Sequence, residues 1–186
     1  MDPADTTDSP TAALLSAHAH DLRNQLATLR SVGQLLDDEE IRTALVEATS
    51  SLQTFVERGV VSARVERGEL PQLEPIGLIR LVQLAAARAR REGLAGVVSV
   101  PDERGDDLIA VRGPWAERLL ADLLHLAAVP ELHVAGGPSV GTWQVSCVLD
   151  PARVERWVPY LLRVADASGC ELAITGDSAA VTMSAA

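Results

Sequence analysis

The sequence has no lysine among its 186 residues, and all sixteen of its basic residues are arginines. The lysines that hold ATP phosphates in P-loop proteins and protein kinases, and those that form Schiff bases, are therefore missing. Cysteine is scarce too, because Cys147 and Cys170 lie far apart and form no C-x-x-C motif. We expect reduced, structural thiols and neither a disulfide framework nor a zinc site.

Long apolar runs are also missing. Arg, Asp or Glu interrupts the most apolar stretches well before the roughly 18 positions that a membrane-spanning helix needs. The N-terminus, MDPADTTDSP, is acidic and polar, whereas a secretory signal starts basic and continues apolar. These features predict a cytoplasmic protein that has no membrane partner.

The balance of charge is negative, with a formal net charge of −10. Binding to a phosphate backbone depends on clustered positive charge, so this balance argues against nucleic acid as a partner and favours a protein or a small molecule. Apolar residues make up 47% of the chain, which is enough for the core of one mid-sized domain or two small ones.

The first part of the chain predicts a helical hairpin over residues 11–70, after a disordered segment at 1–10. Between residues 11 and 36 the apolar positions alternate spacings of four and three, as in a helix of a coiled-coil-like bundle. The positions in this seam are Leu15, Ala19, Leu22, Leu26, Leu29, Gly33 and Leu36. The acidic residues 37–40 suggest a turn and suit the start of a second helix, which runs to about Arg67.

Two helices with a narrow apolar seam cannot enclose a core alone. Two such hairpins from a symmetric pair of chains can form a four-helix bundle, so we expect a homodimer. The alternative is that the hairpin packs on the rest of its own chain.

Beyond Pro71 the pattern becomes mixed and predicts an α+β fold, a small sandwich over residues 71–186. The expected helices cover residues 76–92, 114–128 and 151–167. The expected strands cover residues 96–101, 132–135, 142–149, 171–175 and 179–183. Gly136 and Gly137 are expected to lie in a hairpin turn and not in a phosphate-binding loop.

The segment His20-Asp21-Leu22-Arg23-Asn24 carries the candidate chemistry. A helix places His20 and Asn24 one turn apart, on a face turned away from the seam. A solvated imidazole beside a carboxylate suits attack on phosphorus, with Asp21 as the base. Asn24 could place a water for hydrolysis of an acyl phosphate, and Arg23 is available for contacts with oxyanions of a partner. His18 is expected to flank the bundle and not to be a second acceptor.

This segment resembles the H-box of sensor histidine kinases, a histidine followed by an acidic residue, a leucine, often an arginine, and then Asn or Thr. Gln25 stands where the family often has a proline that bends the helix. The resemblance implies a dimerisation and phosphotransfer domain, with Asp21 assisting transfer and Asn24 supporting phosphatase activity. Residues 71–186 are similar in order to the ATP-binding domain of that family.

The resemblance also implies that this second domain is degenerate. Our alignment puts Asp122, Leu126 and Val129 where active members have residues that hold the nucleotide and its magnesium, and only the aspartate could bind a metal. Asp150 falls near the adenine-recognising aspartate, but Pro151-Ala152-Arg153 follows in place of glycines and the lid is missing. We therefore expect no ATP and no metal or other cofactor in this chain; magnesium, if used, would belong to a receiver partner.

These features together predict a histidine phosphotransferase that relays phosphoryl groups between receiver-domain aspartates in a phosphorelay, without autophosphorylation. Its partners would be response regulators or the receiver of a hybrid kinase. Three alternatives stay open: a pseudokinase adaptor without chemistry, a phosphatase of aspartyl phosphates that relies on Asn24, and a weakly active kinase with an unrecognised nucleotide site.

Overall fold

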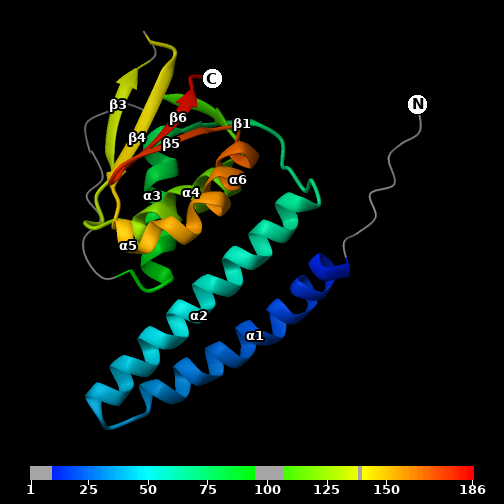
Figure 1. Cartoon of the computed structure of the whole chain (residues 1–186), viewed down its shortest axis with the longest axis vertical. Helices are drawn as coiled ribbons and strands as arrows, with labels where there is room; N and C mark the ends of the chain where they lie inside the picture. The colour runs from blue at the N-terminus through cyan, green and yellow to red at the C-terminus, as the bar shows by residue number, and fades with distance from the viewer. Residues whose placement is uncertain (1–9, 95–106, 138–139) are drawn as a thin grey trace. The chain divides into compact units, whose positions relative to one another are not determined.

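The structure is a computed structural model that describes residues 10–94, 107–137 and 140–186 (Figure 1). For residues 10–18, 20 and 21 it describes the backbone only. The chain divides into two compact units, Met1–Glu69 and Leu70–Ala186, and each is described by itself. No helix in these described ranges is long and apolar enough to cross a membrane.

The first unit is a hairpin of two long helices, α1 (Pro10–Gln34) and α2 (Glu39–Glu66). Asp38 caps α2: its Oδ1 accepts hydrogen bonds from the backbone N–H groups of Glu40 and Ile41, at 3.0 and 3.1 Å. The acidic turn thus satisfies two N–H groups that the first turn of the helix leaves unpaired. At the other end, Gly68 follows α2 with a φ of 68°, a left-handed conformation that suits glycine. Both helices and the turn between them agree with the sequence prediction.

The apolar seam of α1 is divided into two adjacent rows, of which one is buried and the other exposed. Ala19 and Leu26 are buried, at 3% and 6% exposure, and Gly33, a further seven residues on, is buried as well. Leu22 and Leu29 remain 44% and 45% exposed. The hairpin by itself therefore buries only one row of the predicted seam. One partner helix covers only one row of a heptad pattern, and the second row needs another surface.

The second unit is an α+β domain built on a four-stranded antiparallel sheet of order β3-β4-β6-β5. Its strands are β3 (His133–Gly137), β4 (Thr142–Val148), β5 (Glu171–Thr175) and β6 (Ser178–Ser184). Alternate residues of β4 and β6 are buried, including Trp143, Val145, Val181 and Met183. Helices α3 (Leu78–Arg91), α4 (Gly113–Leu126) and α6 (Val158–Ser168) cover that face (Figure 1). The α+β class is as predicted.

A second, two-stranded sheet escaped the sequence prediction. Strands β1 (Glu74–Gly77) and β2 (Leu108–Val111) pair antiparallel, with Ile76 opposite Ile109. Residues 76 and 77, which were expected to begin a helix, belong to β1, and the helix starts at Leu78. Pro75 within the strand masked the signal; it is tolerated because a two-stranded sheet consists of edge strands. The strand expected at residues 96–101 lies outside the described residues.

The helix expected over residues 151–167 is broken into three pieces. Helix α5 (Pro151–Val154) is followed by the short 3-10 helix η1 (Glu155–Trp157) and then by α6. Pro159 explains the break, because proline cannot donate a backbone hydrogen bond and is accommodated in the first turn of a new helix. Gly169, with a φ of 76°, ends α6 as expected.

Candidate functional site

The predicted phosphoacceptor segment lies inside the uninterrupted helix α1. His20 and Asp21 have helical backbones, and their side chains lie outside the described part of the chain. Asn24, one turn after His20, has an exposed side chain, and its backbone carbonyl accepts a hydrogen bond of 2.9 Å from Thr28 Oγ1. The amide predicted to act with His20 is therefore reachable from solvent.

Arg23 is joined to α2 by an ion pair with Glu57. Its Nε donates to Glu57 Oε1, and its Nη2 donates to Oε2 at 3.0 Å, so the contact is bidentate. The two side chains are 35% and 22% exposed. The hydrogen bonds with Glu57 raise the pKa of Arg23 above its ordinary value. Arg23, next to Asn24 in the sequence, thus links α1 to α2. From the sequence, Arg23 was expected only to contact a partner.

Asn24 and the exposed row of leucines lie on different sides of α1. Leu22 and Leu29 are seven residues apart, so they share one side of the helix. At about 100° per residue, Asn24 lies more than a third of a turn away from that row. A surface that covers Leu22 and Leu29 would therefore leave Asn24 accessible.

In the second unit, Asp122 lies where the resemblance places a residue that holds the nucleotide's metal, and it is fully buried. Arg118, one turn earlier on α4, donates from Nε to Oδ2 and from Nη2 to Oδ1 of Asp122, both at 2.8 Å. The hydroxyl of Tyr160, on α6, donates to Oδ2 at 2.8 Å. Asp122 was the one position in the sequence comparison that could still bind a metal. Both of its carboxylate oxygens already accept hydrogen bonds from side chains of this protein.

Charge and burial shift the pKa values of this cluster in consistent directions. Burial lowers the pKa of Arg118, but the charge and hydrogen bonds of Asp122 raise it by more. Burial raises the pKa of Tyr160, and the negative charge of Asp122 raises it further. The guanidinium of Arg118 and the phenol of Tyr160 therefore keep their protons beside Asp122, in a buried, hydrogen-bonded group.

A third helix joins this cluster through Glu92, which immediately follows α3. Its Oε1 accepts a hydrogen bond of 2.7 Å from Arg118 Nη1, and its Oε2 lies 3.5 Å from Nε2 of His125. Arg88 of α3 donates to Glu117 of α4 at 2.7 Å on the same side. Helices α3, α4 and α6 are thus connected by side-chain hydrogen bonds in the space around Asp122.

Of the other positions compared with the ATP-binding domain, Asp150 and Leu126 have structural roles. Asp150 caps α5, where its Oδ1 accepts a hydrogen bond of 3.0 Å from the N–H of Ala152. Leu126 is buried in the core, whereas Val129 is 58% exposed. Gly136 and Gly137, which were expected in the hairpin turn, are instead the last two residues of β3, and Gly136 pairs with Trp143 of β4. Its φ is 102°, and a Cβ there would lie 2.5 Å from the carbonyl oxygen of Thr142, so only glycine fits.

No group of three or more potential metal ligands occurs within the described ranges. Both cysteines are free and buried. Burial raises the pKa of Cys147 to about 11 and that of Cys170 to about 12, so both are protonated at neutral pH. This is the environment of structural thiols, in line with the sequence prediction.

Sequence reasoning missed both Glu57 and the partners of Asp122. The spacing of Arg118 and Asp122, four residues apart on a helix, was a usable signal for an ion pair. The partnership of Arg23 with Glu57 and that of Tyr160 with Asp122 join different helices. No spacing in the sequence indicates either one.

Comparison with solved structures gives the fold. The histidine kinase AdeS of Acinetobacter baumannii matches with a TM-score of 0.52 and 14% identity, over 90% of this chain and 97% of that one. The chain has a histidine-kinase-like fold. A histidine kinase from Burkholderia phymatum STM815 has a TM-score of 0.44 at 20% identity, over 95% and 98% of the two chains. A bacterial phosphotransferase has a TM-score of 0.40 at 13% identity, over 92% and 94%.

At these identities the likeness concerns the fold alone. No protein-family model matches the sequence, and no curated protein matches it.

Proposed function

We propose that this protein is a dimeric histidine phosphotransferase, which relays a phosphoryl group between receiver-domain aspartates through His20 and does not use ATP. One observation carries the proposal: within a histidine-kinase-like fold, Asp122 is fully buried and bonded to Arg118 and Tyr160. A carboxylate in that state has no exposed oxygen to offer to a magnesium–nucleotide complex. The ATP-binding half is then a folded domain without a nucleotide, while the H-box segment remains in place on α1.

In the proposed reaction, an imidazole nitrogen of His20 attacks the phosphorus of an aspartyl phosphate. The bond between phosphorus and the acyl oxygen breaks, and the receiver's aspartate leaves as a carboxylate. Asp21 takes the proton that the second ring nitrogen releases. Transfer onward reverses these steps on another receiver. Magnesium, if required, is bound by the receiver, and Asn24 positions a water in the competing hydrolysis.

The exposed apolar row supports the dimer. Leu22 and Leu29 on α1 are matched on α2 by Ile41, Leu52 and Phe55, which are 57%, 52% and 63% exposed. Exposed apolar side chains in such numbers on one hairpin indicate a surface that is covered in the assembled protein. A second copy of the hairpin supplies a matching surface and completes a four-helix bundle.

The test uses the full chain and a receiver domain that carries radiolabelled phosphate on its aspartate. Acid-labile label should appear on the wild-type protein, and it should be lost in His20→Ala but kept in the matched variant His18→Ala. Label on both variants would overturn His20 as the acceptor. Labelling of the protein by Mg–ATP alone would overturn the claim that it works without ATP.

Two alternatives predict other outcomes in the same assay. A phosphatase would release free phosphate in a reaction that Asn24→Ala abolishes and His20→Ala spares. An adaptor would bind the receiver without moving its label, and neither variant would change that result.

A further inference from the structure

Strand β5 forms one edge of the four-stranded sheet, and within the described residues it pairs only with β6. The two strands are joined by the two-residue turn Gly176-Asp177. Gly176 has a φ of 59° and no residue other than glycine has a positive φ among those described, which is the pattern of a type II′ turn. In such a hairpin Thr175 and Ser178 exchange both backbone hydrogen bonds, and the pairs alternate from there.

This alternation turns the backbone N–H and C=O groups of Leu172 and Ile174 away from β6. No described hydrogen bond outside the ladder involves these groups. Natural sheets usually protect an edge with a proline, a bulge or a charged side chain along the strand. The only charged residue of β5 is Glu171, at its first position. Leu172, Ala173 and Ile174 provide none of these, so this part of the edge is open for pairing with another strand.

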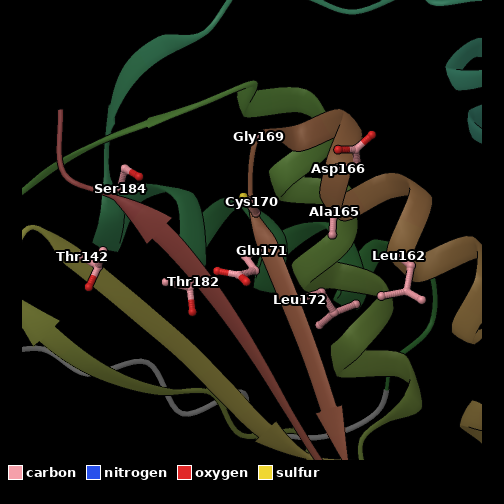
Figure 2. A pocket seen from close by; sticks show the side chains of 10 residues that line it. All are labelled: Thr142, Leu162, Ala165, Asp166, Gly169, Cys170, Glu171, Leu172, Thr182 and Ser184. Atoms are coloured by element: carbon pink, nitrogen blue, oxygen red, sulfur yellow. The ribbon is translucent and has the colours of Figure 1, made fainter.

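A groove of about 420 Å³ lies at the start of β5 and is lined by α6, β5 and the neighbouring ends of β4 and β6 (Figure 2). Leu162 and Ala165 of α6 and Leu172 of β5 give it an apolar side. The carboxylates of Asp166 and Glu171 also line it, and both residues are exposed. Neither carboxylate has an ion-pair partner among the described residues, so the groove carries unneutralised negative charge.

We propose that the β5 edge and this groove bind an extended, basic peptide segment of a partner protein. The peptide backbone adds a strand to the sheet by bonding to Leu172 and Ile174. On the face of the added strand that is turned toward α6, apolar side chains of the peptide meet Leu162. On its other face, basic side chains meet Glu171, and Asp166 adds negative charge nearby. Main-chain hydrogen bonds supply affinity in this mode of recognition, and side-chain pockets supply specificity. The inference is independent of phosphotransfer.

The test uses the full chain and a fluorescein-labelled octapeptide of alternating valine and arginine, with a valine–glutamate peptide as its control. The arginine peptide should bind, and NMR hydrogen exchange at the amides of Leu172 and Ile174 should slow at saturation. The amides of β3, on the opposite edge, should be unchanged. Asp166→Asn and Glu171→Gln should each weaken binding about twofold to fivefold, as expected for exposed ion pairs. Asp177→Asn, in the turn outside the groove, should leave affinity unaltered.

Three results would overturn the proposal. The first is no binding of the arginine peptide, or equal binding of the glutamate peptide. The second is binding that leaves exchange at Leu172 and Ile174 unchanged. The third is hydrogen exchange at these amides that is slow without peptide and becomes slower as the protein concentration rises. That result would make a second copy of this chain the occupant of the edge.

Discussion

Arg118 and Asp122, one turn apart on α4, share two hydrogen bonds of 2.8 Å, and both side chains are almost completely withdrawn from solvent. Tyr160 donates a further hydrogen bond to Asp122, and Glu92 accepts one from Arg118. A buried charge pair is costly to break, because removal of one partner leaves the other as an uncompensated charge.

The first prediction concerns this pair. Asp122→Ala should lower the free energy of unfolding by about 3–5 kcal/mol, because Arg118 stays buried without its main counter-charge. Urea unfolding followed by circular dichroism measures the change. Asp166→Ala, on the exposed side of α6, is the control and should change stability by no more than about 0.5 kcal/mol. If both variants lower the free energy of unfolding equally, the buried pair contributes no more to stability than an exposed residue.

The second prediction concerns the pH dependence of stability. Burial acts to raise the pKa of Glu92, but His125 and Arg118 lower it by more, so its folded-state pKa lies below the ordinary value. Its contribution to stability is then complete above the unfolded-state pKa of about 4.3 and is lost as the pH falls through the folded-state pKa. Glu92→Gln should therefore reduce the acid sensitivity of urea unfolding between neutral pH and about pH 3. Glu47→Gln, an exposed change on α2, is the control; an unaltered pH profile in Glu92→Gln would contradict the prediction.

The third prediction concerns the exposed row of α1. Leu22→Lys combined with Leu29→Lys should convert a dimer into a monomer, because four lysine charges per dimer would be buried or brought together at the interface. Light scattering coupled to size-exclusion chromatography gives the molar mass directly. Ala27→Lys, an exposed position on another side of the same helix, should remain dimeric. A wild-type monomer, or a dimer in both variants, would contradict the proposed bundle.

The fourth prediction separates two roles of Arg23. Arg23→Glu should destabilise the hairpin through like charges at Glu57, and the exchange Arg23→Glu with Glu57→Arg should recover about 0.5–1 kcal/mol, as expected of a partly exposed ion pair. Phosphotransfer by the exchanged variant reports on the second role. If Arg23 also contacts the receiver, the exchanged variant regains thermal stability but not the transfer rate. Recovery of both would leave Arg23 with a structural role alone.

The sequence predicts the hairpin well, because its signals are local. The acidic run at residues 37–40 marks the turn, and Asp38 caps α2 as such a residue should. The division of the seam between Ala19 with Leu26 and Leu22 with Leu29 could not be predicted in the same way. All four fit one apolar spacing, and only the position of α2 decides which of them are covered.

In the second unit the missed features depend on contacts between distant segments. Strand β2 exists because Leu108–Val111 meets Glu74–Gly77, more than thirty residues earlier in the chain. Tyr160 reaches Asp122 from a different helix, so no local periodicity reports the contact. The break before α6 could have been predicted from the sequence, because Pro159 marks it. The apolar spacing across residues 151–167 favoured one continuous helix instead.

If the proposed dimer forms, the two rows of α1 also bear on how its choice of partner can change during evolution. Ala19, Leu26 and Gly33 are buried in the hairpin, whereas Leu22 and Leu29 form an adjacent row that remains exposed. Substitutions in the second row can therefore alter which chains associate without disturbing the folding of each hairpin. After a gene duplication, a few substitutions at these positions could prevent the two copies from forming mixed dimers.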